Sequence, residues 1–270
     1  MSIFRRCLRA DGYCLTRRRF IWLLPLCFSA LIVMDSVDVA VNLLRGYAND
    51  ISVWYFYFQS MSFGGLYGPY LGPMLCALPY ACMIASERQT GMVRSSLPRA
   101  GRTQYLLSKY LCAALSGAVV YSLGIVLLVF ICRLTGLTYI LPEDIDGMRN
   151  FFYFDLFDHA PWRYYLVAAW YAFLSGGLFA GVSALVATRT TQTGVVVVTP
   201  MVLTFVVIRL CQLTGITNEY RLDRWLVMRT MPPGLGIAES VLLITALCLA
   251  LSALIGAACV LSGRRAMRNA

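Results

Sequence analysis

Six long apolar runs alternate with polar segments along this chain. Each run has about 20 residues or more, which as a helix spans the roughly 30 Å hydrocarbon core of a bilayer. The pattern predicts an all-α integral membrane protein whose six transmembrane helices form one domain, residues 20–262. The predicted spans are residues 20–41, 63–85, 105–133, 164–188, 194–212 and 237–262.

The composition agrees with this class of protein. Hydrophobic residues make up 59% of the chain and charged residues 13%, whereas soluble proteins have about 25% charged residues. The net charge is +10, but the basic residues flank the apolar runs. We therefore interpret them as anchors to the lipid bilayer and expect no nucleic-acid partner.

The basic residues also predict an orientation. They concentrate in residues 1–19, in the loop between the second and third runs, and in the tail, residues 263–270. By the positive-inside rule these segments and both termini face the cytoplasm, which predicts a multi-pass protein of the inner (plasma) membrane of the cell. Apolar residues can share one helical face of residues 1–19, which predicts an N-terminal amphipathic interface helix.

Two of the apolar runs contain glycine or proline residues that affect helix geometry. The second run carries three prolines, each of which removes a backbone donor, so its helix should be kinked or interrupted. Such a kink fits a helix that lines a pathway, and it equally fits a kink held by packing. Small residues spaced four apart permit close helix contact. The glycines with this spacing are Gly64, Gly68 and Gly72 in the second run and Gly177 and Gly181 in the fourth. The three prolines of the second run are Pro69, Pro73 and Pro79.

The loop between the second and third runs, residues 87–109, is polar and basic. Val93 and Leu97 lie four residues apart and share a helical face, while Pro98 stops a helix. This spacing predicts a short amphipathic helix before Pro98. We expect Glu87 near its start, where the helix dipole favours a carboxylate.

This loop resembles the first cytoplasmic loop of type-2 ABC transporter permeases. The resemblance rests on Glu-Arg-Gln-Thr-Gly at residues 87–91, Leu-Pro-Arg at 97–99, Tyr-Leu at 105–106 and Ser-Lys-Tyr at 108–110. It implies a short cytoplasmic coupling helix that rests in a groove of a separate ABC ATPase subunit. The residues implied to dock the ATPase are Glu87, Arg88, Gly91, Met92, Val93, Arg94, Leu97 and Pro98.

The same resemblance implies an assembly and a function. Two permease chains, either identical copies or a chain and its paralogue, form the substrate pathway of an ATP-driven exporter. The N-terminal helix is a connecting helix near the ATPase, and ATP and Mg²⁺ bind in the ATPase. Short helices before the last span also occur in this family, which agrees with an amphipathic pattern in residues 220–231.

Motifs for catalysis are missing from this sequence. It has no P-loop, no HExxH and no GxSxG, and His159 is its one histidine. We therefore expect a transport subunit without a catalytic, cofactor or metal site of its own. A membrane enzyme or an immunity factor is a further alternative.

Three charged residues near the predicted outer ends of spans support an alternative function. Asp35 and Asp38 face the same way in the first run, and Arg209 lies in the fifth. Charges within a span are often functional, which would suit a transporter or channel driven by an ion gradient without an ATPase. Hydrated helix ends and a snorkelling arginine explain the same residues more simply.

Overall fold

The structure is a computed structural model that describes residues 3–17, 19–45, 52–61, 70–92, 101–140, 153 and 155–266. These residues are mostly helical and form no strand, apart from one isolated bridge between Ser52 and Thr138. The helices are α1 (Ile3–Thr16), α2 (Arg19–Asp35), α3 (Val37–Leu44), α4 (Val53–Ser60), α5 (Gly72–Ala77), α6 (Ala81–Gln89), α8 (Arg102–Leu134), α10 (Asp155–His159), α11 (Pro161–Ala187), α12 (Thr193–Leu213), α13 (Leu222–Leu226) and α14 (Ile237–Ala266), with a short 3₁₀ helix at Asn218–Tyr220.

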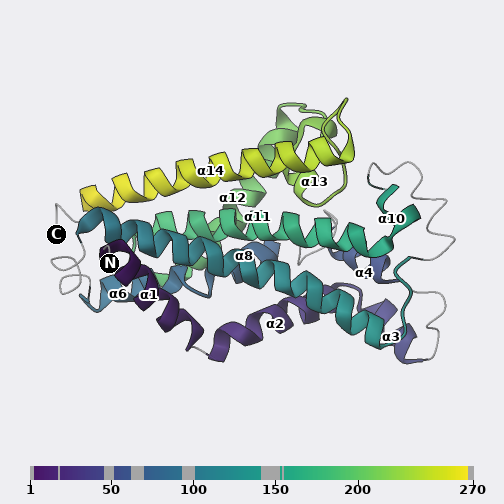
Figure 1. Cartoon of the computed structure of the whole chain (residues 1–270), viewed down its shortest axis with the longest axis horizontal. Helices are drawn as coiled ribbons and strands as arrows, with labels where there is room; N and C mark the ends of the chain where they lie inside the picture. The colour runs from purple at the N-terminus through teal and green to yellow at the C-terminus, as the bar shows by residue number, and fades with distance from the viewer. Residues whose placement is uncertain are drawn as a thin grey trace.

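The antiparallel helices α8 and α11 lie side by side at the centre of the bundle (Figure 1). In their most apolar stretches 50% and 56% of residues are buried inside the chain, against 17% in α12 and in α14. The long outer helices therefore turn most of their apolar surface away from the rest of the chain, as expected for helices that face lipid or another subunit.

Four helices, α8, α11, α12 and α14, are long and apolar enough to cross a membrane. They agree closely with the predicted third to sixth spans, and the chain fits an all-α membrane protein. The first predicted span is instead divided at Ser36 into α2 and α3. Polar residues such as Asp35 and Ser36 favour helix ends over helix interiors, which accounts for the break.

The interruption predicted in the second run is present in its described part. A turn at residues 78–80, which contains Pro79, separates α5 from α6, and Pro73 lies in the first turn of α5. Proline tolerates a first turn and disrupts a helix interior, so both positions follow from its chemistry. Gly64, Gly68 and Pro69 lie outside the described residues.

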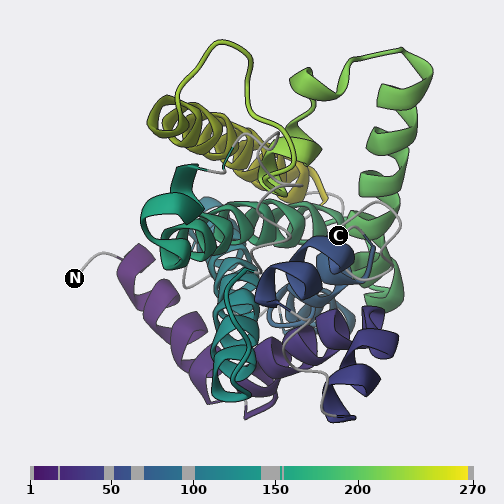
Figure 2. The ribbon, with the colours of Figure 1, turned by 90° about the vertical axis from the view of Figure 1, so that its right-hand side faces the viewer.

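The two ends of the bundle differ in content. The α6 end contains α1, α6, the start of α8 and the end of α14, whereas the α13 end contains α4, α10 and α13 (Figures 1 and 2). At the α13 end, aromatic side chains of α4 pack into the core, where the ring centroids of Tyr57 and Tyr164 lie 6.1 Å apart.

The central helices approach each other through glycine. A Cβ atom on Gly117 of α8 would lie 2.8 Å from the carbonyl oxygen of Gly176 in α11, and one on Gly176 would lie 2.7 Å from that of Gly117. Close packing of α11 is thus present, but the tightest contact involves Gly176 rather than the predicted Gly177. Gly181 packs against the Tyr110 ring. Which glycine faces α8 depends on the rotation of both helices about their axes.

We predict that Gly117→Ala destabilises the protein. In an open helix this change stabilises by about 0.5–1 kcal/mol, but here the new methyl group would overlap Ala180 and two backbone carbonyls. Overpacking should lower stability by about 1–3 kcal/mol, measured as the thermal unfolding midpoint in detergent. Gly177→Ala is the control, because its Cβ would have ordinary contacts of 3.6 Å. Equal midpoints for the two variants would contradict the close contact.

Candidate functional site

A buried lysine joins three segments at the α6 end. Lys109, near the start of α8, is only 5% exposed. Its Nζ lies 2.8 Å from Oδ1 of Asp11 in α1 and 2.6 Å from Oε1 of Glu87 in α6. It also donates a hydrogen bond of 3.0 Å to the hydroxyl of Tyr80, just before α6. One ammonium group therefore connects α1, α6 and α8.

Two residues of α8 complete the coordination of these carboxylates. The Tyr105 hydroxyl donates to Oε2 of Glu87 at 2.7 Å, and the Ser108 hydroxyl donates to Oδ2 of Asp11. Both oxygens of each carboxylate thus have a partner, which offsets the desolvation of the charges. We call this group the Lys109 cluster, and it consists of Asp11, Tyr80, Glu87, Tyr105, Ser108 and Lys109.

Local sequence explains how α1 reaches the cluster. Leu8, Asp11 and Leu15 are spaced three and four residues apart, so they share one face of the helix. The two leucines pack against the core at the α6 end, and Asp11 between them is buried. A carboxyl group on an apolar helical face needs a cation opposite it, and Lys109 supplies that cation. Residues 3–16 form an N-terminal helix, and its place at a membrane interface stays a prediction.

The position of Glu87 differs from the prediction. It lies in the last turn of α6 rather than near the start of a helix. The dipole disfavours a carboxylate at a helix C-terminus, so Glu87 depends on Lys109 and Tyr105 for its stabilisation. In the structure the side chain contacts Lys109 and Tyr105 of α8.

Arg88 also turns toward the bundle. Its Nη1 donates a 3.1 Å hydrogen bond to the carbonyl oxygen of Ala187, the last residue of α11. A cation is favoured at this helix C-terminus, where carbonyl groups lack intrahelical partners. Partial burial lowers the pKa of the Arg88 guanidinium, which stays charged at neutral pH. Glu87 and Arg88 therefore fasten α6 to α8 and α11, respectively.

The chain beyond α6 begins a turn. Thr90 caps the helix, Gly91 has a φ of +74°, and the side chain of Met92 is 62% exposed. A glycine in this left-handed region is a usual way to end a helix. The predicted helix therefore does not run through residues 90–92. The other residues predicted to dock the ATPase, Val93, Arg94, Leu97 and Pro98, lie outside the described residues.

Helix α14, which corresponds to the last predicted span, is hydrogen-bonded to other segments at the α6 end of the bundle. The Arg264 guanidinium in α14 donates hydrogen bonds to the Thr103 hydroxyl at the start of α8. Nε of Arg189, in the turn between α11 and α12, donates to the Ser262 hydroxyl of α14. Polar contacts thus connect α1, α6, α8, α11 and α14 at this one end.

The structure does not bring the other candidate charges together. Arg209 donates a 3.0 Å hydrogen bond to Oε1 of Gln212, and its guanidinium lies 5.3 Å from the Phe205 ring centroid. Asp35 and Asp38 flank the break between α2 and α3. Among ion pairs in the described part of the chain, none joins Arg209 to either aspartate.

Sequence reasoning missed Asp11 and Tyr80 as parts of the site. Two signals were present. Lys109 is the one lysine among the basic residues, and Asp11 is the one acidic residue before Asp35. A lone lysine at the edge of an apolar run is a candidate for pairing with a carboxylate. The sequence could not reveal which carboxylate this was, because several lie closer in sequence.

A scan of protein-family models found no match to this chain, and no curated protein matches it. The interpretation of the site therefore rests on its geometry. Within the described ranges no group of His, Cys, Asp and Glu could hold a metal ion. In the Lys109 cluster an ammonium group already lies between the two carboxylates, so the cluster is suited to joining helices mechanically.

We predict that Lys109→Met loosens this end of the bundle. The change leaves Asp11 and Glu87 as two buried carboxylates without their cation, which should lower the free energy of unfolding by about 3–5 kcal/mol. Thermal unfolding and tryptic cleavage within α1 measure the effect. Arg133→Met is the control, because Arg133 is exposed at the other end of α8. Similar stability and cleavage in both variants would contradict the assigned role of Lys109.

Proposed function

We propose that this chain is the membrane-spanning permease subunit of an ATP-driven ABC exporter. It has six transmembrane segments and pairs with a second copy or a paralogue to form the substrate pathway. A separate ABC ATPase docks on the loop between the second and third segments. ATP and Mg²⁺ bind in that ATPase, and this chain carries no hydrolytic site.

The Lys109 cluster is the observation that carries this proposal. A loop that transmits force must be rigidly joined to the helices that it moves. The cluster joins α6, which leads into the proposed docking loop, to α8, which leads out of it. The same lysine attaches α1, the proposed connecting helix.

These contacts assign different roles to the residues that position the loop and to those that dock the ATPase. Glu87 and Arg88 hold α6 against α8 and α11, so they position the loop and do not themselves face the ATPase. Met92 is exposed beyond them, and its apolar side chain suits a groove in a partner protein. The docking surface then consists of Gly91, Met92 and the residues that follow, up to Pro98.

The interrupted second segment gives the loop a way to act. The turn at residues 78–80 divides this segment, so α6 can be displaced relative to α5 without bending a continuous helix. A push on the loop would move α6 together with the ends of α1 and α8. In a pair of permeases this motion would open or close the pathway between them. The proposed orientation places the α6 end in the cytoplasm.

We predict that Met92→Asp separates the ATPase from the permease. The Met92 side chain should contribute about 2 kcal/mol to the free energy of binding when it is buried in the ATPase, so its loss should reduce binding more than tenfold. The tagged full-length chain is purified from its native membranes, and quantitative mass spectrometry measures the P-loop ATPase that accompanies it. The thermal unfolding midpoint should stay unchanged, because Met92 is exposed.

Leu213→Asp is the matched control, since Leu213 is 83% exposed at the α13 end. This variant should retain the ATPase. Full ATPase retention by Met92→Asp would contradict the docking surface. Full transport by the purified chain alone, driven by an ion gradient in proteoliposomes, would instead support the ion-driven alternative.

A further inference from the structure

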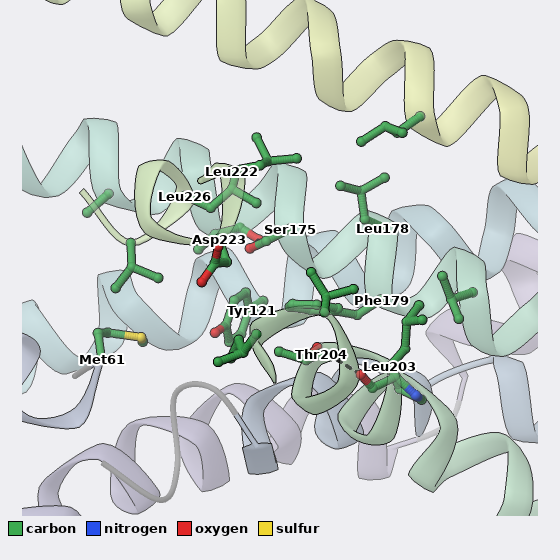
Figure 3. Close-up of a pocket in the computed structure, with 18 of the residues that line it drawn as sticks. Met61, Tyr121, Ser175, Leu178, Phe179, Leu203, Thr204, Leu222, Asp223 and Leu226 are labelled. Atoms are coloured by element: carbon green, nitrogen blue, oxygen red, sulfur yellow. Dashed lines mark hydrogen bonds between the residues drawn. The ribbon is translucent and has the colours of Figure 1, made fainter. Parts of the chain in front are cut away.

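A mostly apolar cavity of about 410 Å³ lies between α11, α12 and α14, with α13 and the end of α4 at one end of it (Figure 3). This volume is within the range of roughly 300–1,000 Å³ typical of small-molecule sites. Two of its few polar side chains are satisfied within their own helices. Ser175 donates to the carbonyl of Ala172, and Thr204 donates to that of Pro200. Most of the wall therefore presents hydrocarbon to an occupant.

The cavity offers no charge to an occupant. Among the described lining residues Asp223 is the one charged side chain, and both of its oxygens accept hydrogen bonds from Arg221. The distances are 3.2 Å from Nε to Oδ1 and 2.7 Å from Nη2 to Oδ2. A charged molecule would lose its hydration here without gaining an opposite charge. The wall therefore selects an uncharged occupant.

One lining residue has a hydrogen-bonding group that the protein leaves unused. The side chain of Tyr57 in α4 is 2% exposed and lines the cavity. Its ring packs between those of Tyr164 and Tyr165, with centroid distances of 6.1 and 6.5 Å. Among the hydrogen bonds of the described residues, none involves its hydroxyl, and the hydroxyl oxygen is not fully enclosed. A buried tyrosine hydroxyl usually has a partner, so an oxygen acceptor in the cavity would supply one.

The Tyr57 hydroxyl can act as a donor. Burial raises its pKa above the ordinary value, so the group keeps its proton at neutral pH. The matching group on an occupant is therefore a carbonyl or ether oxygen, and a carbonyl is the better acceptor of the two. The tyrosine lies at the α13 end, which places this contact at one end of the cavity (Figure 1).

The rest of the cavity suits an extended hydrocarbon chain. On α11 its lining runs from Ala168 to Val182, which is about 21 Å along a helix. Figure 3 shows Met61, which follows α4, toward one end of the lining side chains and Leu203 toward the other. One leaflet of the hydrocarbon core is about 15 Å deep. A chain that begins at Tyr57 can therefore lie along α11 for the depth of a leaflet.

The cavity is accessible from the side. Helix α12 packs on α11, α5 and α6, whereas α14 packs on α11, α8 and α13 (Figure 2). The lining residues Leu203 and Val207 of α12 and Leu251 of α14 are exposed. In a membrane-spanning bundle, exposed apolar residues at this depth face lipid, so a lipid chain can enter between α12 and α14.

We propose that the cavity binds one acyl chain of a membrane glycerolipid, whose ester carbonyl accepts a hydrogen bond from the Tyr57 hydroxyl. In a glycerolipid this uncharged carbonyl stands where the hydrocarbon chain begins, which matches a donor at one end of an apolar cavity. The head group stays outside, so its charge does not determine binding. The site lies within one chain, at the opposite end from the Lys109 cluster, and does not depend on docking of an ATPase.

The first test asks whether a lipid chain occupies the cavity. The purified full-length chain is placed in nanodiscs of ether-linked phosphatidylcholine, with an ester-linked phosphatidylcholine probe that carries a diazirine on one acyl chain. After photolysis, mass spectrometry should find the label on α11 and α12 peptides around the cavity. Val207→Trp should remove this labelling by filling the cavity. Leu210→Trp, at an exposed position on α12 outside the cavity, should leave it unchanged.

The second test asks whether Tyr57 recognises the ester. A matched probe with ether-linked chains lacks the carbonyl, so it should label the cavity peptides about fivefold less than the ester probe, as expected for the loss of one hydrogen bond. Tyr57→Phe should abolish this preference by weakening the ester labelling alone. Tyr55→Phe is the control, because it removes an exposed hydroxyl from the same helix and should keep the preference.

Three results would overturn the proposal. The first is labelling that persists in Val207→Trp, and the second is an ester preference that is missing in the wild type or survives in Tyr57→Phe. The third is a benzoylphenylalanine at position 203 that captures a second copy of the chain instead of lipid.

Discussion

The ion pairs of Lys109 hold together the end of the molecule on which the proposed function depends. A buried ammonium group is strongly destabilising unless carboxylates surround it, and here Asp11 and Glu87 both do so within 2.8 Å. Removing any one of these three residues leaves the charges of the others less completely paired in an apolar environment. Separation of any one of α1, α6 and α8 would leave buried charges less well paired, which favours movement of the three helices together.

The helices at the centre of the bundle are also closely packed, whereas the outer helices are packed less closely. Helices α8 and α11 meet through Gly117 and Gly176 with almost no space between their backbones. Helix α14 packs on both α8 and α11, and α12 packs on α11, but only 17% of the most apolar stretch of each outer helix is buried. A close-packed centre with apolar outer helices is the arrangement that the proposed transmission of force along the bundle requires.

The two ends of the bundle use arginine and lysine differently. Lys109 is a compact cation that contacts two carboxylates and the Tyr80 hydroxyl, so its charge is neutralised inside the protein. Arg221 near α13 instead pairs with Asp223, two residues further along the chain, with 2.7 Å between Nη2 and Oδ2. The first arrangement joins helices, whereas the second stays within one short segment.

The sequence by itself determined where the long helices lie, because a run of apolar residues is a local property that the bilayer requires. The boundaries of α8, α11, α12 and α14 agree with the prediction within a few residues. The break at Pro79 was equally predictable, since proline acts on its own backbone. Six spans and their orientation stay predictions.

Only the tertiary structure decided how the charged side chains pair. Glu87 and Arg88 were predicted to dock a partner protein, and in the structure their side chains contact Tyr105 and Ala187. Docking itself stays a prediction. Asp11 was not recognised, and Gly176 rather than Gly177 makes the closest helix contact. The physical reason is the same in each case. The direction of a side chain depends on the rotation of its helix, and that rotation is set by helices far away in the sequence.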